Sequence, residues 1–317
     1  MRVGAVFPGQ GSQSVGMGGA IAACSPIAAD LFERAKRVLG YDLQALVRDG
    51  PEDVLRETRF SQPAIFVVNY ALAAAAGGDL QTVASAGHSF GEFCSLTLAG
   101  SLDFEEALAL VNRRGLAMQD AAERAPGAMA AILGLDAERV REAVAGAGPE
   151  GRAQLANFNA PGQIVISGDR DAVARAGALA TALGAKRVVP LNVSGAWHSA
   201  LMEPAREAFV PWIERAPIEL PSFTVISNVD AQPYRDVATI RRNLIRSVSS
   251  EVQWHATAQR LLAEGLDLVV EFGGSPVLTP LMRRMDGVPA TLHVGDEGGL
   301  TKLARMLEAK QGVATGP

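Results

Sequence analysis

Short apolar runs alternate with amphipathic stretches along most of this 317-residue chain. The run at 3–7 (Val-Gly-Ala-Val-Phe) predicts a buried strand, whereas the stretches at 62–76 and 104–125 predict helices. Strands and helices that alternate in this way form a mainly parallel sheet with helices packed on its faces. We therefore expect an α/β fold, and the chain is long enough for one large or two modest domains.

The middle of the chain departs from this pattern. Residues 128–191 predict strands and helices in the order βαββαβ, which is typical of a ferredoxin-like domain. We expect this small domain at 127–194, inserted into a large domain that residues 1–126 and 195–317 form together. Its expected elements are strands at 128–133, 153–158, 163–168 and 186–191 and helices at 137–145 and 171–183.

The charge balance excludes several classes of partner. A net charge of −5 and a pI near 5.5 provide no general attraction for nucleic acid or for an anionic membrane surface.

The apolar run before Pro8 is too short for a signal peptide and no stretch reaches the length of a membrane span, so we expect a cytoplasmic protein. The two cysteines, Cys24 and Cys94, lack metal-ligand spacing, and we expect neither a metal site nor a cofactor.

The five residues Gly87-His88-Ser89-Phe90-Gly91 lie between a predicted strand at 82–86 and a predicted helix at 90–99. A G-x-S-x-G sequence in this setting is typical of a nucleophile elbow, in which a sharp turn exposes the serine hydroxyl at the end of a strand. We therefore expect the large domain to be α/β-hydrolase-like, with Ser89 as the nucleophile. The alternative is a glycine-rich turn in which the serine only caps a helix.

A serine hydroxyl needs a base, and histidine is the usual one because its pKa lies near neutral. Of the four histidines, His198 is the best candidate, because it follows a bend of small residues and precedes a helix whose expected N-cap is Ser199. The positive end of that helix disfavours the protonated ring. The alternative is a loop histidine without a role. No aspartate or glutamate stands out to orient the ring, but a backbone carbonyl can do so.

Arg114 lies on the apolar stripe of the helix predicted at 104–125, together with Ala107, Val111 and Met118. A guanidinium keeps its charge, so burying it without an anionic partner is expensive. Two interpretations remain open, an internal salt bridge and a bidentate clamp on a substrate carboxylate.

The loop Phe7-Pro8-Gly9-Gln10-Gly11-Ser12-Gln13 follows the first predicted strand, where a dinucleotide-binding loop would also lie. The G-x-G-x-x-G pattern requires a glycine at position 14, and the residue there is Ser14. The loop can instead bring a backbone N–H, such as that of Gln10, close to a ligand. Together with the N–H of Phe90, such a donor forms an oxyanion hole.

In this order, these segments resemble the malonyl-CoA:acyl carrier protein transacylase family, the acyltransferases of fatty-acid and polyketide synthesis. The similarity covers residues 3–310. It implies an enzyme that moves a malonyl group from malonyl-CoA to the phosphopantetheine thiol of an acyl carrier protein through an acyl-serine. The matching segments are Phe7 to Gln13, Gly87 to Glu92, Asn112 to Gly115, Asn157 to Gln163, Ser194 to Met202 and Val252-Gln253-Trp254.

The resemblance also implies roles for single residues. It makes Ser89 the nucleophile and His198 the base, and it places Gln10 at the oxyanion. It makes Arg114 the clamp on the malonyl carboxylate, and it implies that the main-chain carbonyl of Gln253 orients His198.

Phe90 and Trp197 depart from the family pattern beside the acyl pocket, which leaves another carboxylated extender unit, such as methylmalonyl, as an alternative. A serine thioester hydrolase and a non-catalytic scaffold that binds a carrier protein also stay open as interpretations. Carrier proteins are typically acidic, as this chain is, so docking requires a basic patch near the site. Arg283 and Arg284 are the candidates.

Overall fold

The computed structural model describes residues 1–77, 80–149 and 152–313. Its larger sheet has five strands in the order β7-β2-β1-β8-β9, and every neighbouring pair is parallel. This confirms the predicted α/β fold with a mainly parallel sheet. Because β1 and β2 are neighbours, the loops that follow them meet at one edge of the sheet. The strands are β1 (Val3–Phe7), β2 (Thr82–Gly87), β7 (Thr224–Ile226), β8 (Leu268–Phe272) and β9 (Ala290–Val294).

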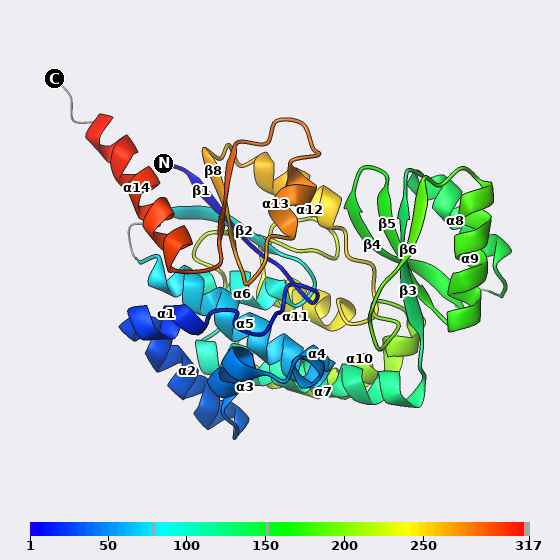
Figure 1. Cartoon of the computed structure of the whole chain (residues 1–317), viewed down its shortest axis with the longest axis horizontal. Coiled ribbons are helices and arrows are strands. Elements are labelled where there is room, and N and C mark those ends of the chain that lie inside the picture. Colours follow the sequence, from blue (N-terminus) through cyan, green and yellow to red (C-terminus); the bar gives the residue numbers. More distant parts are fainter. Residues whose placement is uncertain (78–79, 150–151, 314–317) are drawn as a thin grey trace.

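Helices cover both faces of this sheet (Figure 1). Val3, Ala5 and Phe7 of β1 point into the larger core, whereas Val6 points into a smaller core with α12 (Trp254–Leu262) and α13 (Leu278–Met282). Among the described residues, no helix is both long and apolar enough to cross a bilayer. The helices of the larger core are α1 (Gly19–Cys24), α2 (Pro26–Leu39), α3 (Leu43–Asp49), α4 (Glu52–Arg56), α5 (Thr58–Ala75), α6 (Gly91–Leu98), α7 (Phe104–Arg124), α10 (Glu203–Arg215), α11 (Val237–Arg246) and α14 (Glu297–Val313).

The second sheet is antiparallel, and its strands lie in the order β4-β5-β3-β6. Helices α8 and α9 cover its outer face, where they form a separate core with Ile132, Ile164 and Ile166 (Figure 1). Met129 and Val165 point to the other face and join the larger core. The elements are β3 (Ala128–Leu133), α8 (Ala137–Gly146), β4 (Ala153–Ala160), β5 (Gln163–Gly168), α9 (Arg170–Ala182) and β6 (Arg187–Pro190).

Strand β4 also joins the small sheet to the large part of the chain. Its pairing with β5 is interrupted on both sides of Asn157 and Phe158. At the interruption, the N–H of Phe158 donates to the carbonyl of Val252 at 2.8 Å, and the N–H of Val252 donates to the carbonyl of Ala156 at 2.8 Å. The small sheet is thereby hydrogen-bonded to the segment that precedes α12.

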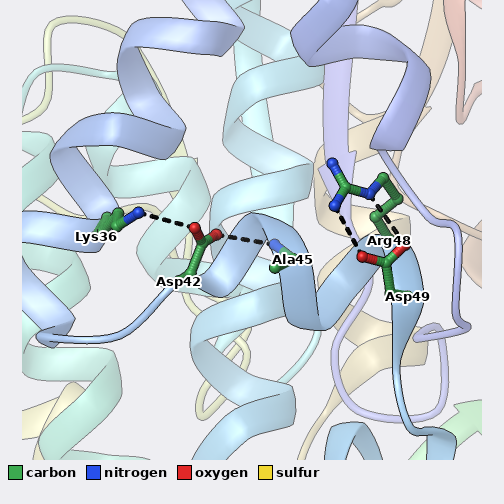
Figure 2. Close-up of polar contacts among 5 residues, drawn as sticks. All are labelled: Lys36, Asp42, Ala45, Arg48 and Asp49. Carbon is green, nitrogen blue, oxygen red and sulfur yellow. Dashed lines mark hydrogen bonds and ion pairs between the residues drawn. The ribbon is translucent and has the colours of Figure 1, made fainter.

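Helix α3 supports the loop that follows β1. Asp42 caps α3 by accepting a hydrogen bond from the N–H of Ala45 at 2.9 Å, and it accepts another from Lys36 at 2.8 Å (Figure 2). Near the end of α3, the carbonyl of Val47 accepts the N–H of Gly16 at 2.7 Å. The capped helix therefore holds the loop that follows β1 through this hydrogen bond.

Candidate active site

A cavity of about 710 Å³ opens between the two sheets. Its walls come from segments far apart in the sequence, the loop after β1, the turn after β2, α7, β4 and the segment between β6 and η1 (Ala200–Met202). Ser89, Arg114 and His198 all line it, together with Asn157 and Asn159 of the small sheet. The structure thus brings together the three residues singled out in the sequence.

The turn from β2 to α6 places Ser89 in the left-handed region, with φ of 54°. This conformation is uncommon for a residue with a side chain, and it is the conformation of a nucleophile elbow. Only glycine fits on either side: a Cβ on Gly91 would lie 2.4 Å from the carbonyl oxygen of Phe7, and one on Gly87 would lie 2.0 Å from Gly91. The turn is therefore packed directly against the end of β1.

Ser89 Oγ lies 2.9 Å from Nε2 of His198, within hydrogen-bond distance. The other ring nitrogen, Nδ1, lies 3.1 Å from the carbonyl oxygen of Ser250, so that it donates there and leaves Nε2 as the acceptor. The expectation that Gln253 supplies this carbonyl is wrong. Gln253 precedes α12, and its carbonyl accepts the N–H of Thr257 at 2.8 Å in the first turn of that helix.

The surroundings keep His198 uncharged. Burial lowers its pKa to about 3, and the positive charge of Arg114 acts in the same direction. The residue is 4% exposed and has φ of 59°, a second strained position next to the first. Ser199 accepts the N–H of Leu201 at 3.3 Å, so it caps η1, which precedes α10. A neutral imidazole beside a serine hydroxyl can take the proton of that hydroxyl.

Arg114 is fully buried, as the helical stripe predicted. Its Nη1 donates to Oε1 of Gln62 at 2.8 Å and its Nη2 donates to Oγ of Ser89 at 3.1 Å, whereas Nε has no acceptor among the described residues. Within the described chain no carboxylate forms an ion pair with it, so the internal salt bridge is not found. Burial lowers its pKa to about 9, against the opposing charge of Glu92, and the guanidinium stays cationic at neutral pH.

Gln10 lies in the loop after β1, and Phe90 directly follows Ser89 at the start of α6. A Cβ on Gly9 would lie 2.7 Å from the carbonyl oxygen of His88, so the loop after β1 touches the turn that carries Ser89. Neither Gln10 nor Phe90 donates its backbone N–H to an acceptor in the described part of the chain. Both N–H groups are therefore available to a ligand, and backbone donors of this kind are what an oxyanion hole is built from.

Several polar residues around the site carried no clear signal in the sequence. Gln62, which accepts a hydrogen bond from Arg114, is one of several polar side chains in the mainly apolar helix α5. His88 lies 3.0 Å from Oδ1 of Asn159, so the nucleophile turn also contacts the small sheet. Glu92 and Asn228 are buried behind the turn. Glu92 ends the segment from Gly87 that resembles the family and is a charged residue in an otherwise apolar helix, but neither signal indicated its partners.

Arg283 and Arg284 are exposed just after α13, whose Leu281 lines the cavity. Nη2 of Arg284 donates to the carbonyl of Pro161 at 3.0 Å, and Nη1 donates to Oε1 of Gln163 at 2.5 Å. Both acceptors belong to the region where β4 turns into β5. Arg284 therefore lies against the small sheet, whereas Nε of Arg283 donates to Oγ1 of Thr291 in β9 at 3.0 Å.

Solved structures resemble this chain over nearly its whole length. An acyl carrier protein S-malonyltransferase from Vibrio cholerae has a TM-score of 0.90 at 39% identity and covers 96% of this chain and 100% of its own. A malonyl-transacylase solved in complex with its type II PKS acyl-carrier protein has a TM-score of 0.92 at 37% identity, with coverage of 96% and 100%. The whole architecture, including both sheets, is therefore shared with these proteins.

Sequence comparison leads to the same family. The malonyl CoA-acyl carrier protein transacylase of Haemophilus influenzae is 39% identical over 305 residues, which is 95% of this chain and 98% of that protein. Residues 5–290 match the acyl transferase domain. The chain therefore belongs to the acyl transferase family.

Proposed function

We propose that this chain transfers a malonyl group from CoA to the phosphopantetheine thiol of an acyl carrier protein through an acyl-Ser89 intermediate. The observation that carries this proposal is the buried guanidinium of Arg114, 3.1 Å from Ser89 Oγ and without a carboxylate partner among the described residues. A malonyl group bound to Ser89 has a free carboxylate that supplies the missing negative charge.

In the first half-reaction, Nε2 of His198 takes the proton of Ser89 as Oγ attacks the thioester carbonyl. The N–H groups of Gln10 and Phe90 stabilise the oxyanion. When the tetrahedral intermediate collapses, the C–S bond breaks and His198 returns the proton to the sulfur of CoA. The Ser250 carbonyl stabilises the transient imidazolium through Nδ1.

In the second half-reaction, the thiol of the carrier protein enters after CoA leaves. His198 takes the thiol proton, the sulfur attacks the acyl-serine, and the proton returns to Oγ of Ser89. A single serine therefore serves both thioesters in turn, which gives ping-pong kinetics.

The side chains around the cavity constrain which acyl group the site accepts. Trp197 is 4% exposed and lines the cavity, and the ring of Phe90 lies 5.8 Å from the guanidinium carbon of Arg114. The bulk of Trp197 in the cavity wall favours malonyl over methylmalonyl, because a branched acyl group needs additional space next to the reacting carbonyl. Phe90 is buried and is not among the described residues that line the cavity.

The architecture supports a further proposal about domains. The small sheet has its own core, and its strand order β4-β5-β3-β6 is that of a ferredoxin-like βαββαβ unit. We infer that residues 127–194 form this unit and that 1–126 and 195–317 form one α/β-hydrolase-like domain. Arg283 and Arg284, at the junction of the two, are our candidates for carrier-protein docking.

The test is to follow malonyl transfer from malonyl-CoA to holo carrier protein, with CoA release measured in parallel without an acceptor. Wild-type protein should transfer the malonyl group, and His198→Ala should lose about 10²–10⁴-fold in rate. His255→Ala is the matched control, because His255 lies on α12 outside the residues that line the cavity. Rapid CoA release without an acceptor would show a hydrolase, and preferred transfer from methylmalonyl-CoA would overturn the acyl group assigned here.

A further inference from the structure

A buried polar cluster lies directly behind the nucleophile turn. It consists of Glu92 near the start of α6, Asn228 just after β7, and Tyr234. One carboxylate oxygen of Glu92 accepts the hydroxyl of Tyr234, and the other accepts both the side-chain amide of Asn228 and, at 2.7 Å, its backbone N–H. Burial raises the pKa of Glu92 to about 7, and these hydrogen bonds oppose that rise. Among the described residues that line the cavity, none belongs to this Glu92–Asn228–Tyr234 cluster.

The cluster is connected to Ser89 through Asn228. The side-chain Nδ2 of Asn228 donates to the carbonyl oxygen of Ser89 at 3.1 Å. That carbonyl belongs to the residue with φ of 54°, and it also accepts the N–H of Glu92 at 3.2 Å. A strained backbone conformation persists only where its surroundings hold it. Asn228 supplies such a contact from outside the turn.

The same residue is connected to His198 by its backbone. The carbonyl of Asn228 accepts the N–H of Gln253 at 2.7 Å. Gln253 ends the short segment that begins at Ser250, whose carbonyl lies 3.1 Å from Nδ1 of His198. Asn228 therefore contacts both the turn that carries the nucleophile and the segment that orients the base.

We propose that Asn228, held by Glu92, is a positioning residue that sets the distance between Ser89 Oγ and His198 Nε2. It acts through the two backbones and does not touch the substrate. This inference rests on the proposed function only in taking malonyl-CoA as the acyl donor. The effect of Asn228 on the reactivity of Ser89 does not depend on which acyl donor is used.

Asn228→Ala removes the side-chain contact to Ser89 and leaves the backbone contact to Gln253 in place. Because a misplacement of about 1 Å can cost about 10²-fold in rate, we expect the rate constant of Ser89 acylation to fall about 10- to 100-fold. KM for malonyl-CoA should stay near the wild-type value, because Arg114 and the other cavity residues are unchanged. The rate is read from the acyl-enzyme by rapid-quench intact mass.

Asn243→Ala is the matched control. Asn243 is also a buried amide, and it donates to Ser227 Oγ at 3.2 Å and to Asp230 Oδ2 at 2.8 Å. It therefore supports the turn at 227–230, which carries Asn228, without touching Ser89. Each variant is also treated with a fluorophosphonate, which reacts with an activated serine and needs neither malonyl-CoA nor the clamp. Thermal midpoints are measured for all variants.

The proposal predicts slower acylation and slower fluorophosphonate labelling in Asn228→Ala than in Asn243→Ala. Equal labelling of the two, or a loss confined to KM, would overturn it. If Asn228→Ala does not fold, Tyr234→Phe, which removes one donor to Glu92, should slow both reactions by a smaller factor, and unchanged rates there would also overturn it. Wild-type protein that is labelled by the fluorophosphonate but forms no malonyl adduct would refute the proposed function alone.

Discussion

Arg114→Ala should reverse the preference of the protein for a charged acyl group. In the structure this guanidinium is fully buried, donates to Gln62 and Ser89, and has no anionic partner among the described residues. The carboxylate of a malonyl group would fill that role. Removing the clamp therefore removes charge-assisted hydrogen bonds that neutral acyl groups never make.

The magnitude follows from the number of bonds. A hydrogen bond to a charged group contributes about 1.5–3 kcal/mol, so a bidentate pair contributes about 3–6 kcal/mol. Since about 1.4 kcal/mol corresponds to a factor of ten, kcat/KM for malonyl-CoA should fall about 10²–10⁴-fold. Acetyl-CoA should gain activity, because its binding no longer leaves a buried positive charge unpaired.

The assay is competition between malonyl-CoA and acetyl-CoA for Ser89, read by intact mass of the acyl-enzyme. Arg113→Ala is the matched control, because it removes the same charge from the adjacent position of α7. Arg113 is exposed there, and its Cζ lies 4.1 Å from the ring centre of Trp212. Arg114→Lys should be intermediate, because it keeps the charge and loses the bidentate geometry. A ratio of malonyl to acetyl adduct that is the same in wild type and Arg114→Ala would refute the clamp.

Four further predictions concern other parts of the protein. Because the pKa of His198 is lowered to about 3, the ring stays neutral, and Ser89 should keep its reactivity toward a fluorophosphonate well below pH 6.5. A loss of this reactivity with a midpoint near pH 6.5 would contradict a buried, neutral base. The same shift implies that the folded state binds fewer protons than the unfolded state, so the thermal midpoint should fall as pH drops below 6.5. Gly91→Ala should abolish acylation, since its Cβ would lie 2.4 Å from the Phe7 carbonyl, and near-normal transfer by this variant would argue against the packed turn. Reversing the charge of both Arg283 and Arg284 should raise KM for the carrier protein and leave KM for malonyl-CoA unchanged, whereas an unchanged carrier KM would remove them from the docking surface.

The secondary structure could be predicted where periodicity and turn residues agree. The strands at 128–133 and 163–168 have the bounds that the sequence predicted. Strand β9 (Ala290–Val294) was not predicted, because at the edge of the sheet only Leu292 and Val294 are buried and the apolar signal is short. The helix expected after Ser199 begins instead as the single turn η1 and continues as α10.

The site was predictable in the positions whose residue type is unusual for their setting. Ser89 lies between glycines after a strand, and Arg114 interrupts an apolar stripe, so each carries a local signal. The carbonyl beside His198 carries none, because every residue type has one, and the choice between Gln253 and Ser250 depends on the path of the main chain before α12. Asn228 lies 139 residues from Ser89 in the sequence, and only the pairing of β7 with β2 brings it close.

The most direct test of the mechanism is whether Ser89 itself carries the malonyl group between the two thiols. Protein incubated with malonyl-CoA alone should gain the mass of one malonyl group on the peptide that contains Ser89, and added holo carrier protein should remove that mass while becoming malonylated. Ser89→Ala should show neither the adduct nor the transfer. Malonylated carrier protein formed at the wild-type rate by Ser89→Ala would contradict the acyl-serine mechanism.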